Sequence, residues 1–233
     1  MADLLVIAPS RGRPRNAADL LGAWRQTRTD NSQLLLAVDE DDPELAGYQA
    51  LKLPEWAELV VGPRERMNPT LNRRALEYVD RHFALGFMGD DHRPRTVGWD
   101  GAITVVLREM GSGIVYGNDL IQGAALPTAV FMTSDIVQAL GYFAPPGLIH
   151  MYADNAWLAL GEGLGRLCYL EGVVIEHLHP VAGTAAWDPG YREVNAPEMY
   201  ERDRNEFRRW LIEDFDDAVA RVNEAISGSP AVR

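Results

Sequence analysis

The chain has 233 residues, and its 47% hydrophobic and 24% charged residues are typical of a folded globular protein, which excludes disorder as its main state. Acidic residues outnumber basic ones by 34 to 22, so the net charge of −12 argues against a broad surface for duplex nucleic acid. The single cysteine, Cys168, excludes an intramolecular disulfide and a cysteine-rich metal site. No apolar run reaches the ~18 residues of a membrane span. The N-terminus lacks the basic residues of a signal peptide, so we expect a cytoplasmic protein.

The first half of the sequence alternates short apolar runs with amphipathic segments. Strands buried on both faces are predicted at residues 4–8, 33–38, 58–61 and 83–88, and helices at residues 16–28 and 69–82. This alternation predicts an α/β fold with a doubly wound, mostly parallel central sheet flanked by helices.

The second half is less regular. Its spacing predicts helices at residues 99–110, 134–140 and 154–160, strands at residues 113–116, 129–132 and 167–175, and a loop at residues 182–196. One C-terminal amphipathic helix is predicted at residues 197–226, with Phe207, Leu211, Phe215, Val219, Val222 and Ile226 on its apolar face. No linker divides the chain, so residues 1–226 should form a single domain and residues 227–233 a flexible tail.

Polar residues follow each strand of the first half. In doubly wound sheets, ligands bind beyond the carboxyl ends of the strands, so these positions are the places to search for a site. The clusters are Ser10-Arg11-Gly12-Arg13, Asp39 to Asp42, Arg64-Glu65-Arg66 and Asp90-Asp91-His92.

Asp90 and Asp91 end a buried strand, where two neighbouring carboxylates repel each other and lose hydration. A divalent cation such as Mg²⁺ or Mn²⁺ would relieve both penalties, because it prefers oxygen ligands. The alternative is a solvated turn in which Asp90 caps the next helix.

His177 and His179 follow a strand and lie two residues apart, so both side chains should point to one face. They could add nitrogen ligands to a metal site that already has a carboxylate pair. The alternative is one packed and one exposed histidine.

The turn after the first strand carries Arg11, Arg13 and Arg15 around Gly12. Arginine binds phosphate through two parallel hydrogen bonds, so the turn is a candidate anion site; the alternative is a solvated basic turn. It is not a P-loop, which needs Gly-Lys-Ser/Thr. Lys52 is the only lysine beside 21 arginines, a bias that suggests a GC-rich genome such as that of an actinobacterium or its phage.

Two single carboxylates are further candidates. Asp39 ends the second strand, where it could accept hydrogen bonds from a base or ribose, or simply lie in a polar turn before Pro43. Asp154 opens a helix, where it could be an N-cap or a general base.

Taken in order, these residues resemble glycosyltransferases of the GT-A fold, in particular the inverting family 2 and its short bacterial and phage relatives. The resemblance covers residues 4–183 and rests on Pro9-Ser10-Arg11, Asp39, Asn72, Gly89-Asp90-Asp91 at the family's Asp-x-Asp metal motif, Ala153-Asp154, and Glu176-His177-Leu178-His179. Gly89 replaces the first acidic residue of the metal motif, and Ala153 replaces an acidic residue, which leaves Asp154 as the only candidate base.

The resemblance implies a single Rossmann-like GT-A domain, with a nucleotide-binding half at residues 1–95 and an acceptor half at residues 96–196. It also implies a metal-dependent, hexosyltransferase-like enzyme whose donor is a nucleotide-sugar, most commonly a UDP-sugar, and whose acceptor is an unknown hydroxyl compound. The nucleotide would be bound by Pro9, Ser10, Arg11, Asp39, Arg64, Asn72 and Asp90. Asp91 with His177 or His179 would hold Mn²⁺ or Mg²⁺, and Asp154 would deprotonate the acceptor for an inverting displacement; a retaining reaction, which needs a different arrangement, is the alternative. We expect a monomer or homodimer.

Aromatic residues of the second half could contact a sugar. Trp157, Trp187 and Tyr191 are candidates for stacking, although core packing suits Trp157 better. Residues 182–196 could form a lid over the donor or an ordinary surface connection.

Three other classes of protein are compatible with part of this pattern. A nucleotidyltransferase would use a similar metal and nucleotide, but it usually needs a Gly-rich, Lys-containing loop after the first strand. A metallohydrolase could use His177, His179 and Asp91, although this class usually needs several histidine ligands and the chain has five histidines. A non-catalytic nucleotide-sugar-binding protein would explain the missing acidic positions.

Overall fold

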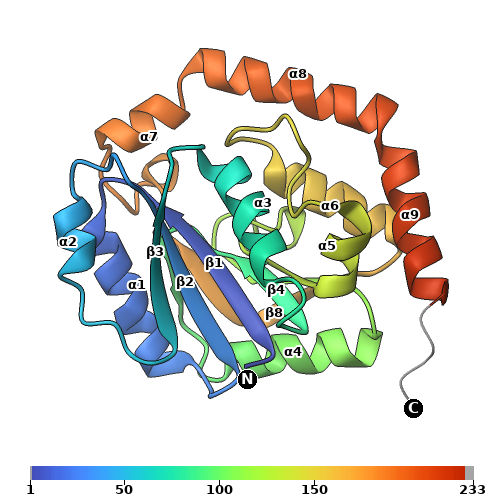
Figure 1. Cartoon of the computed structure of the whole chain (residues 1–233), viewed down its shortest axis with the longest axis horizontal. Helices are drawn as coiled ribbons and strands as arrows, with labels where there is room; N and C mark the ends of the chain where they lie inside the picture. Colours follow the sequence, from blue (N-terminus) through green and yellow to red (C-terminus); the bar gives the residue numbers. More distant parts are fainter. Residues whose placement is uncertain (1, 229–233) are drawn as a thin grey trace.

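The computed structural model describes residues 2–228, which form one mixed α/β domain around an eight-stranded sheet (Figure 1). The strands are β1 (Leu4–Ser10), β2 (Ser32–Asp39), β3 (Ala57–Gly62), β4 (Ala84–Phe87), β5 (His92–Pro94), β6 (Ile114–Asn118), β7 (Val130–Thr133) and β8 (Leu167–His177). The helices are α1 (Pro14–Thr27), α2 (Leu45–Gln49), α3 (Met67–Tyr78), α4 (Trp99–Met110), α5 (Ser134–Leu140), α6 (Ala153–Leu164), α7 (Pro189–Val194), α8 (Pro197–Glu213) and α9 (Phe215–Gly228). Two short 3-10 turns are η1 (Gly123–Ala125) and η2 (Pro180–Ala182).

The strand order is β3-β2-β1-β4-β7-β6-β8-β5. β3, β2, β1 and β4 run parallel, β7 is antiparallel to both of its neighbours, and β8 is parallel to β6. β8 therefore runs in the same direction as β4, and its carboxyl end lies at the same edge of the sheet as the ends of β1, β2 and β4. The topology thus brings the end of the late strand to the polar turns of the first half.

Both faces of the sheet are covered, which is why the strands are continuous apolar runs. On β1, Leu4 and Val6 pack in the core with α1 and α4, whereas Leu5 and Ile7 pack in the core with α3, α5 and α6. Alternate side chains of one strand thereby enter two separate cores.

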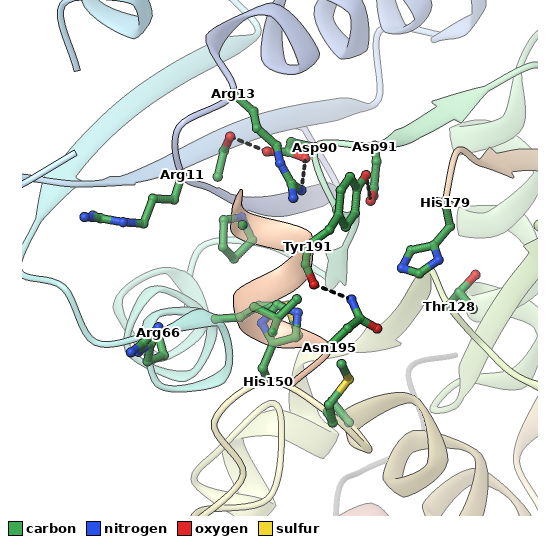
Figure 2. A pocket seen from close by; sticks show the side chains of 18 of the residues that line it. Arg11, Arg13, Arg66, Asp90, Asp91, Thr128, His150, His179, Tyr191 and Asn195 are labelled. Carbon is green, nitrogen blue, oxygen red and sulfur yellow. Dashed lines mark hydrogen bonds and ion pairs between the residues drawn. The ribbon is translucent and has the colours of Figure 1, made fainter. Parts of the chain in front are cut away.

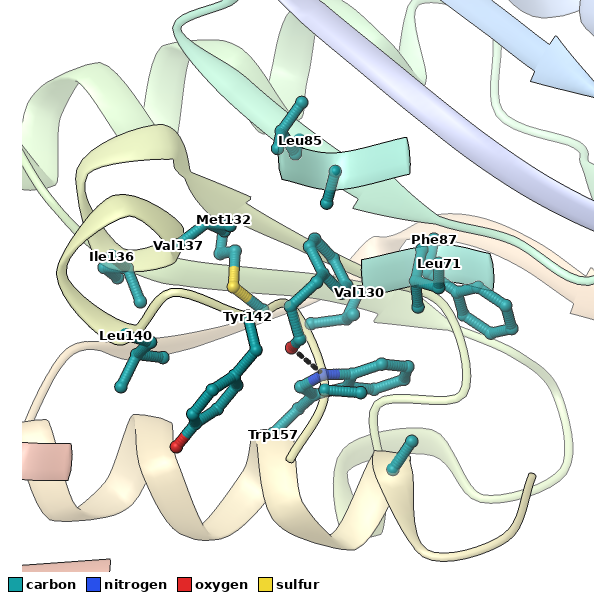
Figure 3. Close-up of a cluster of buried hydrophobic side chains, with 14 of the residues drawn as sticks. Leu71, Leu85, Phe87, Val130, Met132, Ile136, Val137, Leu140, Tyr142 and Trp157 are labelled. Atoms are coloured by element: carbon teal, nitrogen blue, oxygen red, sulfur yellow. Dashed lines mark hydrogen bonds between the residues drawn. The ribbon is translucent and has the colours of Figure 1, made fainter. Parts of the chain in front are cut away.

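Figure 3 shows the second of these cores, in which side chains of α3, β4, β7, α5 and α6 pack together. Trp157 of α6 is 2% exposed, donates a hydrogen bond from Nε1 to the carbonyl of Phe143 at 2.8 Å, and packs 5.4 Å from the ring of Phe87. Core packing is therefore confirmed as the role of Trp157.

The C-terminal segment differs from its prediction. The single helix expected at residues 197–226 is two helices, α8 and α9, separated at Asp214. Figure 1 shows α8 crossing the molecule and α9 turning away from it to lie beside α5 and α6. A straight helix of this length would span ~45 Å and could not follow the rounded body. Trp210 is buried instead of Leu211, which is 38% exposed.

Three other short segments differ from the sequence prediction. The expected loop at residues 182–196 contains the helix α7, and neither the short helix α2 nor the three-residue strand β5 is predicted from the sequence. Of the predicted tail, Ser227 and Gly228 belong to α9, and residues 229–233 lie outside the described residues. Within residues 2–228, no helix combines the length and the apolar character of a membrane span.

Gly86 of β4 gives a test of this packing. A Cβ at Gly86 would lie 2.4 Å from Cδ1 of Phe131, so we expect Gly86→Ala to lower the free energy of unfolding by ~1–3 kcal/mol. Gly22→Ala in α1 is the matched control, because nothing lies within 4 Å of its added Cβ and alanine favours the helix by ~1 kcal/mol. Urea unfolding measures both variants, and equal stability of the two would contradict this description of the sheet.

Candidate active site

A cavity of about 930 Å³ opens where the carboxyl ends of β1, β2, β4 and β8 meet. It brings together most of the residues that the sequence singled out. Its lining includes Pro9, Ser10, Arg11, Asp39, Arg64, Asp90, Asp91, Asp154, His177 and His179.

Asn72 is the exception. Its carboxamide accepts hydrogen bonds from the backbone N–H groups of Phe143 and Ala144 at 2.8 and 2.7 Å, and it donates to the carbonyl of Ala144 at 2.8 Å. This side chain therefore holds the segment after α5 and does not reach the cavity, which corrects its expected place in a nucleotide pocket.

Asp90 is tied to the turn that follows β1. It accepts a hydrogen bond from the hydroxyl of Ser10 at 2.6 Å and from the amide of Asn16 at 3.4 Å, and Arg13 lies 3.5 Å away. Burial and the neighbouring charge of Asp91 raise the pKa of Asp90 to about 6. Ser10 and Asp90 thus support each other and shape the floor of the cavity.

Asp91 points the opposite way, towards the histidines. Its Oδ2 accepts a hydrogen bond from the hydroxyl of Tyr191 at 2.8 Å and lies 3.6 Å from Nε2 of His177, while Oδ1 lies 3.4 Å from Nδ1 of His92. Burial alone would raise the pKa of Asp91, but His177 and His92 outweigh it and hold the pKa well below its usual range. This carboxylate is therefore kept ionised.

Asp91, His92 and His177 form the group that could hold a metal ion, with one ligand atom from each within 4.8 Å of the others. β5 and β8 pair so that His92 lies opposite His177, and the two rings stack with centroids 4.3 Å apart. Neutral imidazole and carboxylate ligands suit Mn²⁺ and related divalent ions. The sequence placed His92 in the polar cluster with Asp90 and Asp91 but did not predict it in the metal group, although its position directly after Asp91 was the available signal.

His179 is not part of this group. Its Nδ1 accepts a hydrogen bond from the backbone N–H of Val181 at 3.3 Å, and its ring packs at 5.3 Å against Tyr191. Of the two histidines expected to bind metal, the structure brings only His177 to Asp91.

Gly89 explains the departure from the Asp-x-Asp pattern. A Cβ at this position would lie 2.4 Å from Oδ1 of Asp91 and 3.0 Å from Nδ1 of His92, and the backbone N–H of Gly89 donates to that same nitrogen at 2.9 Å. An acidic side chain at residue 89 therefore has no room, because His92 and Asp91 occupy its place.

The helix α7 and its N-cap Asp188 line this edge of the cavity, where Figure 2 shows Tyr191. Asp188 binds Arg13 with two hydrogen bonds of 2.7 and 2.9 Å, and the Arg13 guanidinium lies 3.6 Å above the ring of Tyr191. Glu193 pairs with Arg64 at 3.0 Å and also with Arg66. Arg13 and Arg66 belong to the polar clusters predicted from the sequence. Their partners at the cavity, Asp188, Tyr191 and Glu193, come from the segment that was predicted as a loop.

Tyr191 does not present a free face to a sugar. It is 5% exposed, with Arg13 over its ring and its hydroxyl on Asp91. Trp187 is 45% exposed, so its ring is accessible for the stacking on a sugar that the sequence suggests.

Arg11 lies at the other side of the turn. It donates to Asp39 at 2.8 Å and to Asp41 at 2.5 Å. Burial raises the pKa of Asp39 although Arg11 opposes this shift. The pair places one guanidinium and one carboxylate at the end of β2, where a nucleoside could contact both.

Asp154 lies in the first turn of α6, and its Oδ1 accepts a hydrogen bond from the N–H of Asn155 at 2.9 Å. Burial raises the pKa of Asp154, which makes the carboxylate a stronger base than one in water. The chain enters α6 through Tyr152, whose φ is +65°.

Asp203 of α8 fixes this entry. It is fully buried and accepts hydrogen bonds from the N–H groups of Ile149, His150 and Met151, the last two at 2.8 Å. A carboxylate that satisfies successive backbone donors sets the path of the segment leading to Asp154. Neither Asp203 nor its contact with this segment is visible in the sequence pattern.

Comparison with known proteins identifies the fold. No protein-family model matches this sequence, and no curated protein matches it by sequence. Solved structures do match: S. aureus TarS 1-349 aligns with a TM-score of 0.58 at 11% identity over 97% of this chain and 81% of that one. The same fragment in complex with UDP-GlcNAc aligns at 0.59 with 12% identity over 97% and 79% of the two chains. The mannosyltransferase PcManGT from Pyrobaculum calidifontis, in complex with GDP-Man and Mn²⁺, aligns at 0.59 with 12% identity over 99% and 76%. The chain therefore has the GT-A glycosyltransferase fold that its motif order indicates.

His150 gives this site a pH-dependent stability. Its ring lines the cavity, and burial lowers its pKa to about 4. The folded protein then binds fewer protons than the unfolded chain between pH 6.5 and pH 4, so the free energy of unfolding should fall as the pH falls through this window. We expect His150→Gln to remove roughly 2–3 kcal/mol of that fall. Urea unfolding at pH 7.5 and pH 4.5 measures the free energy of unfolding of the unsubstituted protein and of His150→Gln. The two should lose different amounts of this free energy between pH 7.5 and pH 4.5. An equal loss in both proteins would contradict the assignment to His150.

Proposed function

We propose that this protein is a metal-dependent glycosyltransferase that moves a sugar from a nucleotide-sugar to a hydroxyl acceptor. The observation that supports it most directly is the convergence, in a GT-A fold, of an ionised carboxylate, two histidines and several arginines on one cavity at the strand ends. Charge that develops on a departing nucleoside diphosphate needs such cationic surroundings.

The donor would occupy the part of the cavity formed by the first half of the chain. Pro9, Ser10 and Arg11 follow β1, Asp39 ends β2, and Arg64 approaches from the turn after β3. Asp90 supports this floor through Ser10. Solved relatives of the fold are complexes with UDP-GlcNAc and with GDP-Man, and a UDP-sugar that carries a hexose is our first candidate.

Asp91, His92 and His177 would hold the divalent ion, Mn²⁺ or Mg²⁺, whose charge offsets that of the leaving diphosphate. The missing side chain at Gly89 leaves room for Asp91 and His92 to approach each other, and this approach and the ionised state of Asp91 fit a cation at this position.

Asp154 would act as the general base in an inverting displacement. The acceptor oxygen forms a bond to the anomeric carbon of the donor while Asp154 takes the hydroxyl proton. The bond from that carbon to the diphosphate breaks, and the nucleoside diphosphate leaves with the electron pair. The raised pKa of Asp154 favours this proton transfer.

The helix α7 would be the lid that residues 182–196 were expected to provide. The carboxylates of Asp188 and Glu193 bind Arg13, Arg64 and Arg66, three of the arginines that line the cavity. When a donor binds, its phosphate oxygens would replace these carboxylates as partners of the arginines, and α7 would shift.

The nucleotidyltransferase alternative has less support. The loop after β1 carries arginines, and Lys52 is not among the described residues that line the cavity. A cytoplasmic location and a monomeric or homodimeric state stay predictions.

A thermal-shift panel of UDP, GDP, dTDP and CDP, each with and without Mn²⁺, tests the proposed function. We expect one nucleotide with Mn²⁺ to raise the melting temperature by several degrees, because a ligand at ~100 times its Kd stabilises the folded state by ~2.7 kcal/mol. Asp91→Asn should lose the Mn²⁺ dependence. Asp154→Asn should keep the shift but lose ~10²–10⁴-fold in sugar transfer across an acceptor screen. If no nucleotide shifts the melting temperature, the proposal fails; binding without transfer in the unsubstituted protein would favour the non-catalytic alternative.

Glu193→Gln tests the exchange at α7. Without the negative charge at residue 193, Arg64 and Arg66 are free to bind the donor, so we expect the nucleotide Kd to fall about two- to fivefold, as a half-exposed ion pair allows. Glu201→Gln is the matched control, because it makes the same change in net charge on an exposed part of α8 outside the cavity. Weaker nucleotide binding by Glu193→Gln would show that Glu193 supports the donor site instead of competing for it.

A further inference from the structure

The two ends of the cavity differ in chemistry. Arg11, Arg13 and Arg66 lie at one end and Thr128 and His179 at the other (Figure 2). The second end, which we call the acceptor end, is formed by described residues 121–128, 151–157, 181–182 and Tyr200 that line the cavity. Among these lining residues, Asp154 is the only one with a charged side chain.

Hydrogen bonds attach part of this lining to the end of β8 through Asp119. Asp119 accepts the N–H groups of Ile121, Gln122 and Gly123 at 2.7–2.9 Å and the hydroxyl of Thr128 at 2.8 Å. The carbonyl of Asp119 in turn accepts the N–H of His177 at 3.1 Å. The segment after β6 is thus attached to the end of β8, beside the proposed metal group.

Tyr200 of α8 lines the same cavity as Asp154. Burial and the negative charge of Asp154 raise the pKa of the Tyr200 hydroxyl. Val181 of η2 is held beside His179, because its backbone N–H donates a hydrogen bond to Nδ1 of that histidine.

Three of these side chains leave apolar surface in water. Ile121 is 40% exposed, Val181 is 73% exposed and Tyr200 is 42% exposed. A ligand with an apolar group would cover them and gain the free energy of that burial. A phosphorylated or carboxylated ligand would find no lysine or arginine among the described residues 121–128, 151–157, 181–182 and Tyr200, and it would meet the carboxylate of Asp154 in a protein with a net charge of −12.

We propose that the acceptor is an uncharged hydroxyl compound that carries an apolar or aromatic group beside the reacting hydroxyl, and that Ile121, Val181 and Tyr200 form the subsite for this group. The proposal rests on the proposed function, because the acceptor end is defined by Asp154. It names the chemical class of the acceptor, which the donor site leaves open.

Isothermal titration calorimetry with three probes tests the class of compound: phenyl β-glucoside, methyl β-glucoside and glucose 6-phosphate. We expect phenyl β-glucoside to bind about tenfold more tightly than methyl β-glucoside, because the ring buries additional apolar surface. Glucose 6-phosphate should bind more weakly than either glucoside. Tighter binding of the phosphate compound, equal binding of the two glucosides, or no binding of either glucoside overturns the proposal.

Val181→Ser and Val97→Ser are a matched pair of variants. Val181 and Val97 are 73% and 78% exposed, but only Val181 lines the cavity. Val181→Ser should weaken phenyl β-glucoside about threefold and leave methyl β-glucoside unchanged, while Val97→Ser should change neither. Both valines are on the surface, so a loss of folding does not complicate the comparison; equal effects of the two variants on phenyl β-glucoside overturn the assignment of the subsite.

Nucleotide binding separates this proposal from the proposed function. If phenyl β-glucoside binds as expected but no nucleotide shifts the melting temperature, the subsite stands and the glycosyltransferase proposal fails. If nucleotides and Mn²⁺ bind but the glucosides do not, the glycosyltransferase proposal stands and the acceptor class is wrong.

Discussion

Two adjacent carboxylates at the end of β4 are the constraint on which the site depends. Asp90 and Asp91 are both buried and cannot share one environment without strong repulsion. The backbone sends them in opposite directions: Asp90 to Ser10 and Asn16, and Asp91 to the histidines and Tyr191. Elements that are far apart in the sequence are joined through this one turn.

The same turn explains why the late part of the chain is ordered over the cavity. Tyr191 reaches Asp91 from α7, and Leu178 donates its N–H to the carbonyl of Asp91 at 3.0 Å. On the acceptor side, buried Asp203 performs a comparable task for the segment that leads to Asp154. Asp91 of the first half of the chain therefore holds the late segments with Leu178 and Tyr191, and Asp203 of α8 holds the segment that precedes Asp154.

The α/β class and the position of the cavity follow from the sequence, because continuous apolar runs that end in polar turns define both the strands and the edge where ligands bind. The residues that periodicity could not find are those placed by tertiary pairing. His92 joins the metal group only because three-residue β5 pairs with β8 in a register that puts it opposite His177. Asn72 lies on a correctly predicted helix, but the rotation of α3 directs its carboxamide to residues 143–144. The six residues of α7 are too few to show a helical period, and the contacts with Arg13 and Asp91 decide their conformation.

The carboxylates of α7 also bear on how the protein should respond to ionic strength. An empty arginine site attracts a diphosphate strongly in dilute buffer and weakly in salt, since mobile ions screen the attraction. Here the arginines already hold Asp188 and Glu193, and an incoming diphosphate would replace one set of ion pairs by another. Added salt then weakens the pairs that are lost as well as the pairs that are gained. Asp188 and Glu193 would therefore act as built-in counterions, and they would make the affinity for a charged donor less dependent on the salt concentration around the protein.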